Sequence, residues 1–406
     1  MMYIERPKYM TKLEGFIDTP VAKVLTGLRR SGKSALLAML RERLISRGVD
    51  PQRILTINFD ELENASLRDP FILNDHITAQ APDEGPYYVF LDEIQEVPQW
   101  ERVVNSLIAH GQADIYVTGS NSTLLSSELA TYIAGRYVSF EVAPLNFGEF
   151  VEFSIQTGHQ ENSTEQYFRR YLVRGGFPGL FASDYTEEQA RQMTQDIYSS
   201  ILIRDVIGRK QIRSVELFER VALYALDNIG NIFSANRVST YLKSQGKILS
   251  HQTVADYLAA LTEAYALRKV TRYNLRGRAH LETGEKYYAG DHGLVNAAFG
   301  FSRSRIPGLL ENIVQAEMRS RGYKVFVGRM GEAEVDFIGE RQGETIYIQV
   351  SMSILDETTM AREFAPLLAI KDSYPKYVVS MDDFAGGNVQ GVRSVRIWDF
   401  LLDETW

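Results

Sequence analysis

Residues 21–34 read VAKVLTGLRRSGKS, an apolar run followed by the pattern GxxxxGK[ST], and Leu36 and Leu40 continue at helical spacing. A loop of this kind between a strand and a helix binds phosphate. Its glycines let backbone N–H groups converge, and the helix N-terminus adds positive charge. Lys33 is expected to reach the β- and γ-phosphates, and Ser34 to bind Mg²⁺. The sequence therefore predicts a nucleoside triphosphate site.

Two acids end a second apolar run, YYVFLDE, at residues 87–93. An unbroken apolar run of this length is typical of a strand that is buried on both faces. Asp92 is expected to hold Mg²⁺, and Glu93 to orient and polarise the attacking water. Because the acids follow a phosphate-binding loop, they predict the catalytic half of an NTPase.

A third strand at 114–118 ends in the small polar residues of 119–122. Such residues at the carboxyl edge of a parallel sheet lie where ligands bind, so Ser120 or Asn121 is expected to contact the γ-phosphate. Capping of a helix over 122–134 is an equally open role for them. The full set of predicted nucleotide contacts is Gly27, Arg29, Arg30, Ser31, Gly32, Lys33, Ser34, Ala35, Ser120 and Asn121.

Two further strands, at 54–60 and 137–142, predict an α/β core with five parallel strands and intervening helices. This order resembles the AAA+ superfamily, and the whole chain is similar to one bacterial and archaeal branch of it. The resemblance rests on these segments: GLRRSGKS (27–34), LDEIQ (91–95), TGSN (118–121), GR (135–136) and PLNFGEF (144–150).

The resemblance implies ATP as the nucleotide and Arg136 as a catalytic arginine finger that reaches the γ-phosphate of a neighbouring subunit. An arginine finger acting between subunits requires a homo-oligomer, of which a hexameric ring is one form. A role for Arg136 within its own subunit and a surface salt bridge stay open as alternatives.

Composition sets limits on the remaining functions. The chain has 406 residues, 45% of them hydrophobic and 24% charged, as in an ordinary globular protein of about three domains. It has no cysteine, which excludes disulfides and thiolate chemistry, and its six histidines show no metal-ligand spacing. The sequence has no uncharged apolar run long enough to predict a membrane span. We therefore expect no membrane partner and a cytoplasmic location.

The middle of the chain predicts a helical lid at 146–230 and then a winged helix-turn-helix at 231–300. The turn GGFP at 175–178 resembles the lid signature of the family. Arg204 and Arg209 are candidates for a lid sensor, with a solvated charged face as the alternative. The second helix of the helix-turn-helix is expected to pack inward through Val254, Tyr257, Leu258 and Leu261.

DNA, duplex or branched, is the partner predicted for this middle part. Six Lys/Arg and two Glu lie between positions 268 and 286, a local charge of +4 in a chain of −8. Cations on a wing suit contact with backbone phosphates. The predicted DNA-binding residues are Thr253, Arg272, Arg276 and Arg278. A winged helix used for protein contact, or only for packing, stays open.

Residues 301–406 look like the restriction-endonuclease-like fold, which includes archaeal Holliday-junction resolvases. An active member carries an acid on its first helix, an Asp on the middle strand, and acid-x-Lys on the next strand. Glu311 and Asp336 take the first two places here, but the third reads QVS at 349–351. A metal ligand and a cation are thus missing, which predicts an inactive domain in which both acids are structural ion-pair partners, for example with Arg329 or Lys324.

The predicted domains are an ATPase core at 1–145, the lid at 146–230, the winged helix-turn-helix at 231–300 and the nuclease-like domain at 301–406. The function expected from them is Mg²⁺-dependent ATP hydrolysis that couples nucleotide state to DNA binding. Two alternatives stay open. One is an ATP-dependent regulatory switch that binds a protein or an operator through the winged helix, and the other is an ATP-gated, metal-dependent nuclease.

Overall fold

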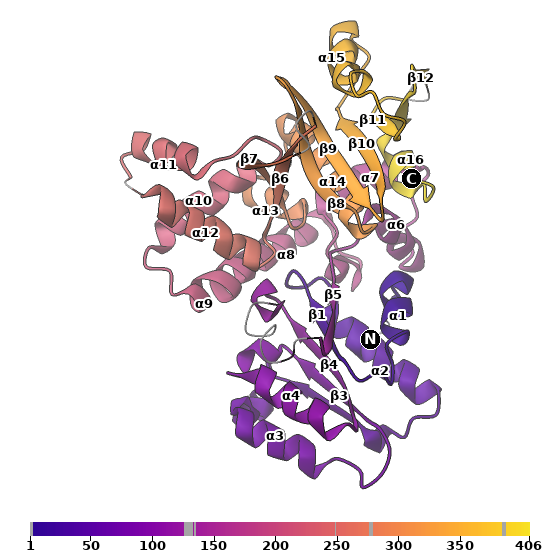
Figure 1. Ribbon diagram of the computed structural model, residues 1–406, viewed down its shortest axis with the longest axis vertical. Coiled ribbons are helices and arrows are strands. Elements are labelled where there is room, and N and C mark those ends of the chain that lie inside the picture. The colour runs from indigo at the N-terminus through magenta and orange to yellow at the C-terminus, as the bar shows by residue number, and fades with distance from the viewer. Residues whose placement is uncertain (1–2, 126–132, 134, 248, 276–278, 384–386) are drawn as a thin grey trace. The chain divides into compact units, whose positions relative to one another are not determined.

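The computed structural model divides into two compact units (Figure 1). The first comprises Met1–Ala143 with Glu263–Tyr265, and the second Pro144–Thr262 with Ala266–Trp406. The description covers the whole chain except residues 1–2, 126–132, 134, 248, 276–278 and 384–386. No helix in the described part is long and apolar enough to cross a membrane.

The first unit alternates strands with helices, as the sequence predicts. Its elements in chain order are α1 (Pro7–Glu14), β1 (Ala22–Thr26), α2 (Lys33–Ser46), η1 (Pro51–Arg53), β2 (Ile54–Asn58), η2 (Leu62–Arg68), α3 (Pro70–Ala79), β3 (Tyr87–Asp92), η3 (Ile94–Glu96), α4 (Trp100–His110), β4 (Ala113–Gly119), η4 (Ser122–Leu125) and β5 (Tyr137–Glu141).

The five strands form one parallel sheet in the order β2-β3-β4-β1-β5, which confirms the predicted α/β core. Strand β1 lies between β4 and β5, while the next strand of the chain, β2, lies at the far edge. The order in which successive strands are added to the sheet therefore changes direction beside β1. Ligands bind at the carboxyl ends of strands next to such a reversal, which is where the loop after β1 emerges.

Both faces of this sheet are covered, which explains the uniform apolar run of β3. Val89 and Leu91 belong to the core cluster that contains α3 and α4 side chains. Tyr88 and Phe90 belong to the opposite cluster with α1 and α2, and the Phe90 ring stacks on Tyr116 of β4 at 4.8 Å. Successive side chains point to opposite faces, so a strand buried on both sides needs apolar residues at every position.

The second unit contains the helices of the middle region and a second sheet. Its elements are α6 (Phe147–Gln156), α7 (Thr164–Arg174), η5 (Pro178–Phe181), α8 (Glu187–Ser200), a π-helical η6 (Ile201–Ile207), α9 (Gly208–Lys210), α10 (Val215–Asp227), α11 (Ala235–Ser244), α12 (His251–Glu263), β6 (Leu267–Asn274), β7 (Ala279–Ala289), α13 (Gly293–Phe299), η7 (Arg303–Arg305), α14 (Ile306–Ser320), β8 (Lys324–Met330), β9 (Ala333–Arg341), β10 (Glu344–Val350), α15 (Glu357–Leu368), β11 (Lys376–Ser380), β12 (Asn388–Val389), β13 (Val392–Arg396) and α16 (Ile397–Leu402).

The second sheet has eight strands in the order β12-β13-β11-β10-β9-β8-β6-β7. The strands expected to flank a wing, β6 and β7, do form an antiparallel pair. However, β6 also pairs with β8 in parallel, through Arg272↔Val327 to Asn274↔Arg329. The hairpin thus continues the sheet of the C-terminal region, and the predicted boundary at 300/301 crosses one continuous sheet. The four-domain division stays a prediction.

Two helices, α11 and α12, form where the sequence predicts those of the helix-turn-helix. The side chain of Ser234 caps α11 by accepting from the Arg237 N–H at 3.2 Å. In α12, the four residues expected to pack inward are all buried: Val254, Tyr257, Leu258 and Leu261. His251 and Gln252 are exposed at the start of this helix, so α12 presents its polar N-terminal face outward.

The turn after α7 and the start of α13 interlock. Asp291 accepts the N–H of Gly176 at 2.8 Å with one carboxylate oxygen and the N–H of Gly293 at 2.7 Å with the other. A Cβ on Gly175 would come within 2.2 Å of the Asp291 carboxylate, so glycine is required at this position, where φ is +81°. Burial raises the pKa of Asp291, and the neighbouring His292 and the two N–H donors oppose that rise.

Two further side chains complete this interlock at the end of α7. A helix leaves its last carbonyls without intrahelical partners. A ring nitrogen of His292 hydrogen-bonds the Tyr171 carbonyl at 2.7 Å, and the Asn296 amide donates to the Leu172 and Val173 carbonyls at 2.9 Å each. The segments GGFP (175–178) and GDHGL (290–294), distant in sequence, therefore form one structural contact.

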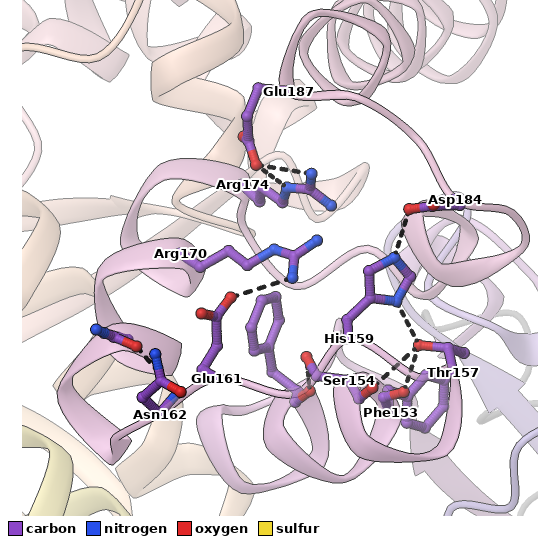
Figure 2. Close-up of polar contacts among 12 residues, drawn as sticks. Phe153, Ser154, Thr157, His159, Glu161, Asn162, Arg170, Arg174, Asp184 and Glu187 are labelled. Carbon is purple, nitrogen blue, oxygen red and sulfur yellow. Dashed lines mark hydrogen bonds and ion pairs between the residues drawn. The ribbon is translucent and has the colours of Figure 1, made fainter.

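Polar contacts also fix the turns between α6, α7 and α8 (Figure 2). His159 bridges the Thr157 hydroxyl at 2.9 Å and the Asp184 carboxylate at 2.8 Å. The order hydroxyl, imidazole and carboxylate resembles a hydrolytic triad. Yet the Thr157 hydroxyl donates to the Phe153 carbonyl at 2.8 Å, and the Asp184 side chain is 92% exposed. The arrangement closes the end of α6 and joins it to the loop before α8.

The Asp291 interlock predicts a stability effect. In Asp291→Asn, one N–H donor would face the new NH₂ group, so a buried donor would lose its acceptor. The free energy of unfolding is expected to fall by about 1–3 kcal/mol, measured by chemical denaturation. Asp196→Asn, at an exposed position of α8, is the matched control. Equal stability of both variants would contradict the interlock.

Candidate nucleotide site

The loop between β1 and α2 has the backbone shape of a phosphate cradle. Gly27, Arg30 and Gly32 have φ values of +142°, +66° and +101°. Left-handed residues interspersed among right-handed ones turn successive N–H groups toward one point. A Cβ on Gly27 would lie 2.1 Å from the Val142 carbonyl oxygen, so glycine is required there.

Polar groups of this loop fit a phosphate ligand. The Lys33 ammonium is almost fully buried and donates to the carbonyls of Gly27 and Leu28, each at 3.0 Å, so it lies over the loop. Ser31 is fully buried, and its hydroxyl has no hydrogen-bond partner among the described residues. Helix α2 starts at Lys33 without a side-chain cap, so N–H groups of its first turn are available for an anion.

Asp92 joins three elements at the carboxyl edge of the sheet. At the end of β3, it accepts hydrogen bonds from the Thr118 hydroxyl on β4 and from the Ser34 hydroxyl on α2. Burial raises the pKa of Asp92 and the charge of Glu93 adds to the rise, while these two hydrogen bonds and Lys33 oppose it. Ser34 and Asp92, predicted as the Mg²⁺ site, are therefore adjacent. A hydroxyl and a carboxylate suit this hard cation.

Glu93 follows Asp92 in a left-handed backbone conformation, with φ of +58°. Its N–H donates to the Thr118 hydroxyl at 2.9 Å, the same hydroxyl that donates to Asp92. The Ser120 hydroxyl donates to the Glu93 carboxylate at 3.5 Å. The predicted metal ligand and the predicted water-polarising residue are thus held side by side by one threonine.

The other predicted nucleotide contacts lie around this edge. Ser120 and Asn121 are buried at the end of β4. Arg29 pairs with Asp60 at 3.3 Å, Arg30 is exposed, and Ala35 lies in the first turn of α2. Residues 122–125 form a short 3₁₀ turn, and most of the helix expected over 122–134 lies outside the described residues.

Arg136 lies at the opposite end of the sheet from the phosphate loop. Its carbonyl accepts the N–H of Ala22, the first residue of β1, at 2.9 Å, whereas the loop follows Thr26 at the other end of that strand. Five strand residues span about 16 Å, more than an extended arginine side chain can reach. The backbone position therefore favours a role toward another subunit, and the role of Arg136 stays a prediction. The exposed guanidinium contacts the Asn105 amide oxygen at 3.3 Å.

The residues predicted to bind DNA are placed less favourably. Thr253 is partly exposed, and its hydroxyl and N–H contact the Ser250 hydroxyl at 2.9 and 3.1 Å. Arg272 is 13% exposed and pairs with Glu334 at 3.8 Å. Arg276 and Arg278 lie outside the described residues. Part of the charge counted from sequence is thus paired with Glu334, an acid outside the counted segment.

Lys286, the last cation of that segment, lies in a buried acidic cluster. Its ammonium is 2.8 Å from Glu334, 3.3 Å from Glu311 and 3.8 Å from Asp336. These three charges raise the pKa of Lys286 above its usual value, against the effect of burial. Glu311 and Asp336 are therefore ion-pair partners, as expected. Their cation is Lys286 of β7, and the prediction of Arg329 or Lys324 is wrong.

Three residues at these two sites were not predicted from sequence: Thr118, Lys286 and Gln95, whose side-chain amide donates to the Glu93 carboxylate. Thr118 directly precedes the polar strand end, and Gln95 lies two positions after Glu93, so proximity in sequence was an available signal for both. Lys286 meets its acids only through the fold, and nothing local in the sequence points to that contact.

The loop geometry predicts the effect of Lys33→Ala. The variant loses the cation that would bind the β- and γ-phosphates, and ATP affinity measured by titration calorimetry is expected to fall about 10- to 100-fold. Lys12→Ala, at an exposed position of α1, is the control and should bind as the wild type does. Unchanged affinity of Lys33→Ala would contradict the assignment of the site.

Comparisons with known proteins agree with this geometry. The family model described as AAA domain matches residues 19–151, and one described as a domain of unknown function (DUF8612) matches 165–305. An uncharacterized protein of Haemophilus influenzae is 34% identical over 400 residues, covering 98% of each chain. An uncharacterized protein of Methanocaldococcus jannaschii is 28% identical over 366 residues, covering 86% of this chain and 79% of its own.

A solved structure has a fold similar to that of this chain. The Walker-type ATPase of Pyrococcus abyssi aligns with a TM-score of 0.50 at 18% identity, over 73% of this chain and 96% of its own. The restriction-endonuclease-like fold expected at 301–406 is not among these matches. The identity to the Haemophilus influenzae protein over nearly all of both chains shows that this chain belongs to that protein's family, with a P-loop AAA domain as its first part.

Proposed function

We propose that this protein is a Mg²⁺-dependent ATPase whose nucleotide state controls DNA binding. The observation that carries the proposal is the contact of Ser34 with Asp92, with Glu93 directly beside them. A hydroxyl and a carboxylate that already meet across α2 and β3 suit a metal ion bound to a triphosphate. A glutamate next to that position suits activation of water.

Each residue would have a separate role in hydrolysis. The loop N–H groups, Ser31 and Lys33 would bind the phosphates. Ser34 and Asp92 would hold Mg²⁺, which draws charge from the phosphate oxygens when bound. Glu93 would take the proton of the attacking water. ATP, rather than another triphosphate, is proposed from the resemblance to the AAA+ superfamily.

We further propose that the active form is a homo-oligomer. Arg136 is exposed and lies at the end of β1 opposite to the phosphate loop of its own subunit, so in an oligomer it would reach the loop of a neighbouring subunit instead. An arginine supplied from a second subunit stabilises the negative charge of the transferring phosphate. This placement fits the arginine finger implied by the family resemblance.

DNA is the proposed partner of the second unit. Its helix-turn-helix presents the polar start of α12, with His251 and Gln252 exposed, as a helix that reads a DNA groove would. The buried pairs of Arg272 and Lys286 reduce the basic surface that the sequence suggested. Contact through the face of α12 is therefore favoured over contact through the strands of the wing.

A regulatory switch is the second candidate function. The pairing of Lys269 with Glu285 and of Arg272 with Glu334 supports it, because a wing whose described cations are paired also suits a protein partner. A switch would keep ATP bound with negligible turnover. The nuclease alternative loses support, because Lys286 occupies the acidic cluster and no group of three acids, histidines or cysteines in the described part of the chain is arranged to hold a metal.

Glu93→Gln tests the catalytic assignment. The amide cannot accept the proton of water, so turnover is expected to fall about 10²- to 10⁴-fold while ATP still binds. Steady-state phosphate release and titration calorimetry measure the two quantities. Glu96→Gln, three positions further on in η3, is the matched control. Turnover by Glu93→Gln at the wild-type rate would rule out Glu93 as the base.

Arg136→Ala tests action between subunits. The variant alone should lose most ATPase activity with its ATP affinity intact. Mixing it with Lys33→Ala should restore activity, because the second variant supplies an intact Arg136 to sites whose loops are intact. Arg41→Ala, an exposed arginine of α2, serves as the control. A mixture no more active than the sum of its parts would argue against an arginine finger.

A further inference from the structure

The carboxylate of Glu93 is held by a residue to which the nucleotide site has so far given no role. Gln95, in η3 just after the β3 end, donates a hydrogen bond from its side-chain amide to Oε2 of Glu93. The Ser120 hydroxyl donates to the same oxygen at 3.5 Å. Among the described residues, the other oxygen, Oε1, has no hydrogen-bond partner. One oxygen is thus fixed and the other is left to accept a proton.

We infer that Gln95 is a positioning residue that orients Glu93 toward the attacking water. The inference rests on the proposed ATP hydrolysis. The backbone of Glu93 supports it. Glu93 has φ of +58°, and its N–H donates to the Thr118 hydroxyl. The backbone therefore fixes the direction in which the side chain leaves the chain, and only the side-chain torsions remain to be set. A donor two residues further along the chain restricts those torsions, which gives the carboxylate one preferred orientation.

The surroundings of Gln95 indicate a function other than stability. Its side-chain oxygen is buried and has no hydrogen-bond partner among the described residues. A buried carbonyl oxygen without a donor destabilises a fold, so a purely structural position would favour an apolar side chain of the same size. The contact that the Gln95 amide does make is the hydrogen bond that its NH₂ group donates to Glu93.

Gly119 at the end of β4 makes room for this amide. A Cβ on Gly119 would come within 2.3 Å of the Gln95 side-chain oxygen and within 1.9 Å of Leu124. The absence of a side chain at the strand end therefore lets Gln95 lie against β4 and reach Glu93. The sequence features DEIQ and TGSN thus form one arrangement around the carboxylate.

The test compares Gln95→Met and Gln95→Glu with the wild type. Methionine keeps the volume and removes the donor, and glutamate keeps the shape and also removes the donor. In both, kcat for ATP hydrolysis is expected to fall about tenfold to a hundredfold, with KM and ATP affinity changed less than about twofold. The melting temperature of Gln95→Met should equal or exceed that of the wild type, because the unpaired oxygen is gone.

Three results are informative beside that expectation. A wild-type kcat in both variants, or a rise in kcat, would overturn the inference. A loss of kcat with an equal loss of thermal stability in both variants would make Gln95 a structural residue and overturn it too. Gln112→Ala, an exposed glutamine of the same unit, is the control. Absence of hydrolysis in the wild type would instead contradict the proposed function itself, which separates the two failures.

Discussion

The hydrogen bonds that Asp92 accepts from Ser34 and Thr118 join the three elements on which the site depends. Ser34 belongs to the helix after the phosphate loop, Asp92 ends β3, and Thr118 lies near the end of β4. Thr118 also accepts the N–H of Glu93 at 2.9 Å, so the same hydroxyl fixes the direction of the glutamate. A carboxylate with this degree of burial requires such donors, since unpaired it would be costly.

The second unit depends on buried acids in a similar way, with a different outcome. Asp291 is satisfied by two backbone N–H groups and joins the turn after α7 to α13. Glu311, Glu334 and Asp336 instead surround the ammonium of Lys286. The ammonium thus contacts Glu311 and Asp336, the two acids that the nuclease resemblance singled out. These contacts join residues of α14, β7 and β9.

Most of the first unit could be predicted from sequence because its signals are local. The phosphate loop, the apolar β3 run and the acids after it are contiguous, and the carboxyl ends of parallel strands necessarily meet at one edge. The second unit was predicted less completely. Nothing near Lys286 in sequence indicates that it meets Glu311, and the pairing of β6 with β8 joins segments that are separated by two helices. The strand register, with Ala22 opposite Tyr137, places Arg136 at the amino end of β1.

The measurement that tests the account most directly is steady-state ATP hydrolysis with no DNA, with linear duplex and with a four-way junction, using Lys33→Ala as the blank. If the protein is an ATPase coupled to DNA, hydrolysis depends on Lys33 and rises when DNA is added, most with the junction. A rate that is the same with every DNA would contradict coupling to DNA and favour the regulatory switch. A rate equal to that of the blank would contradict the ATPase itself.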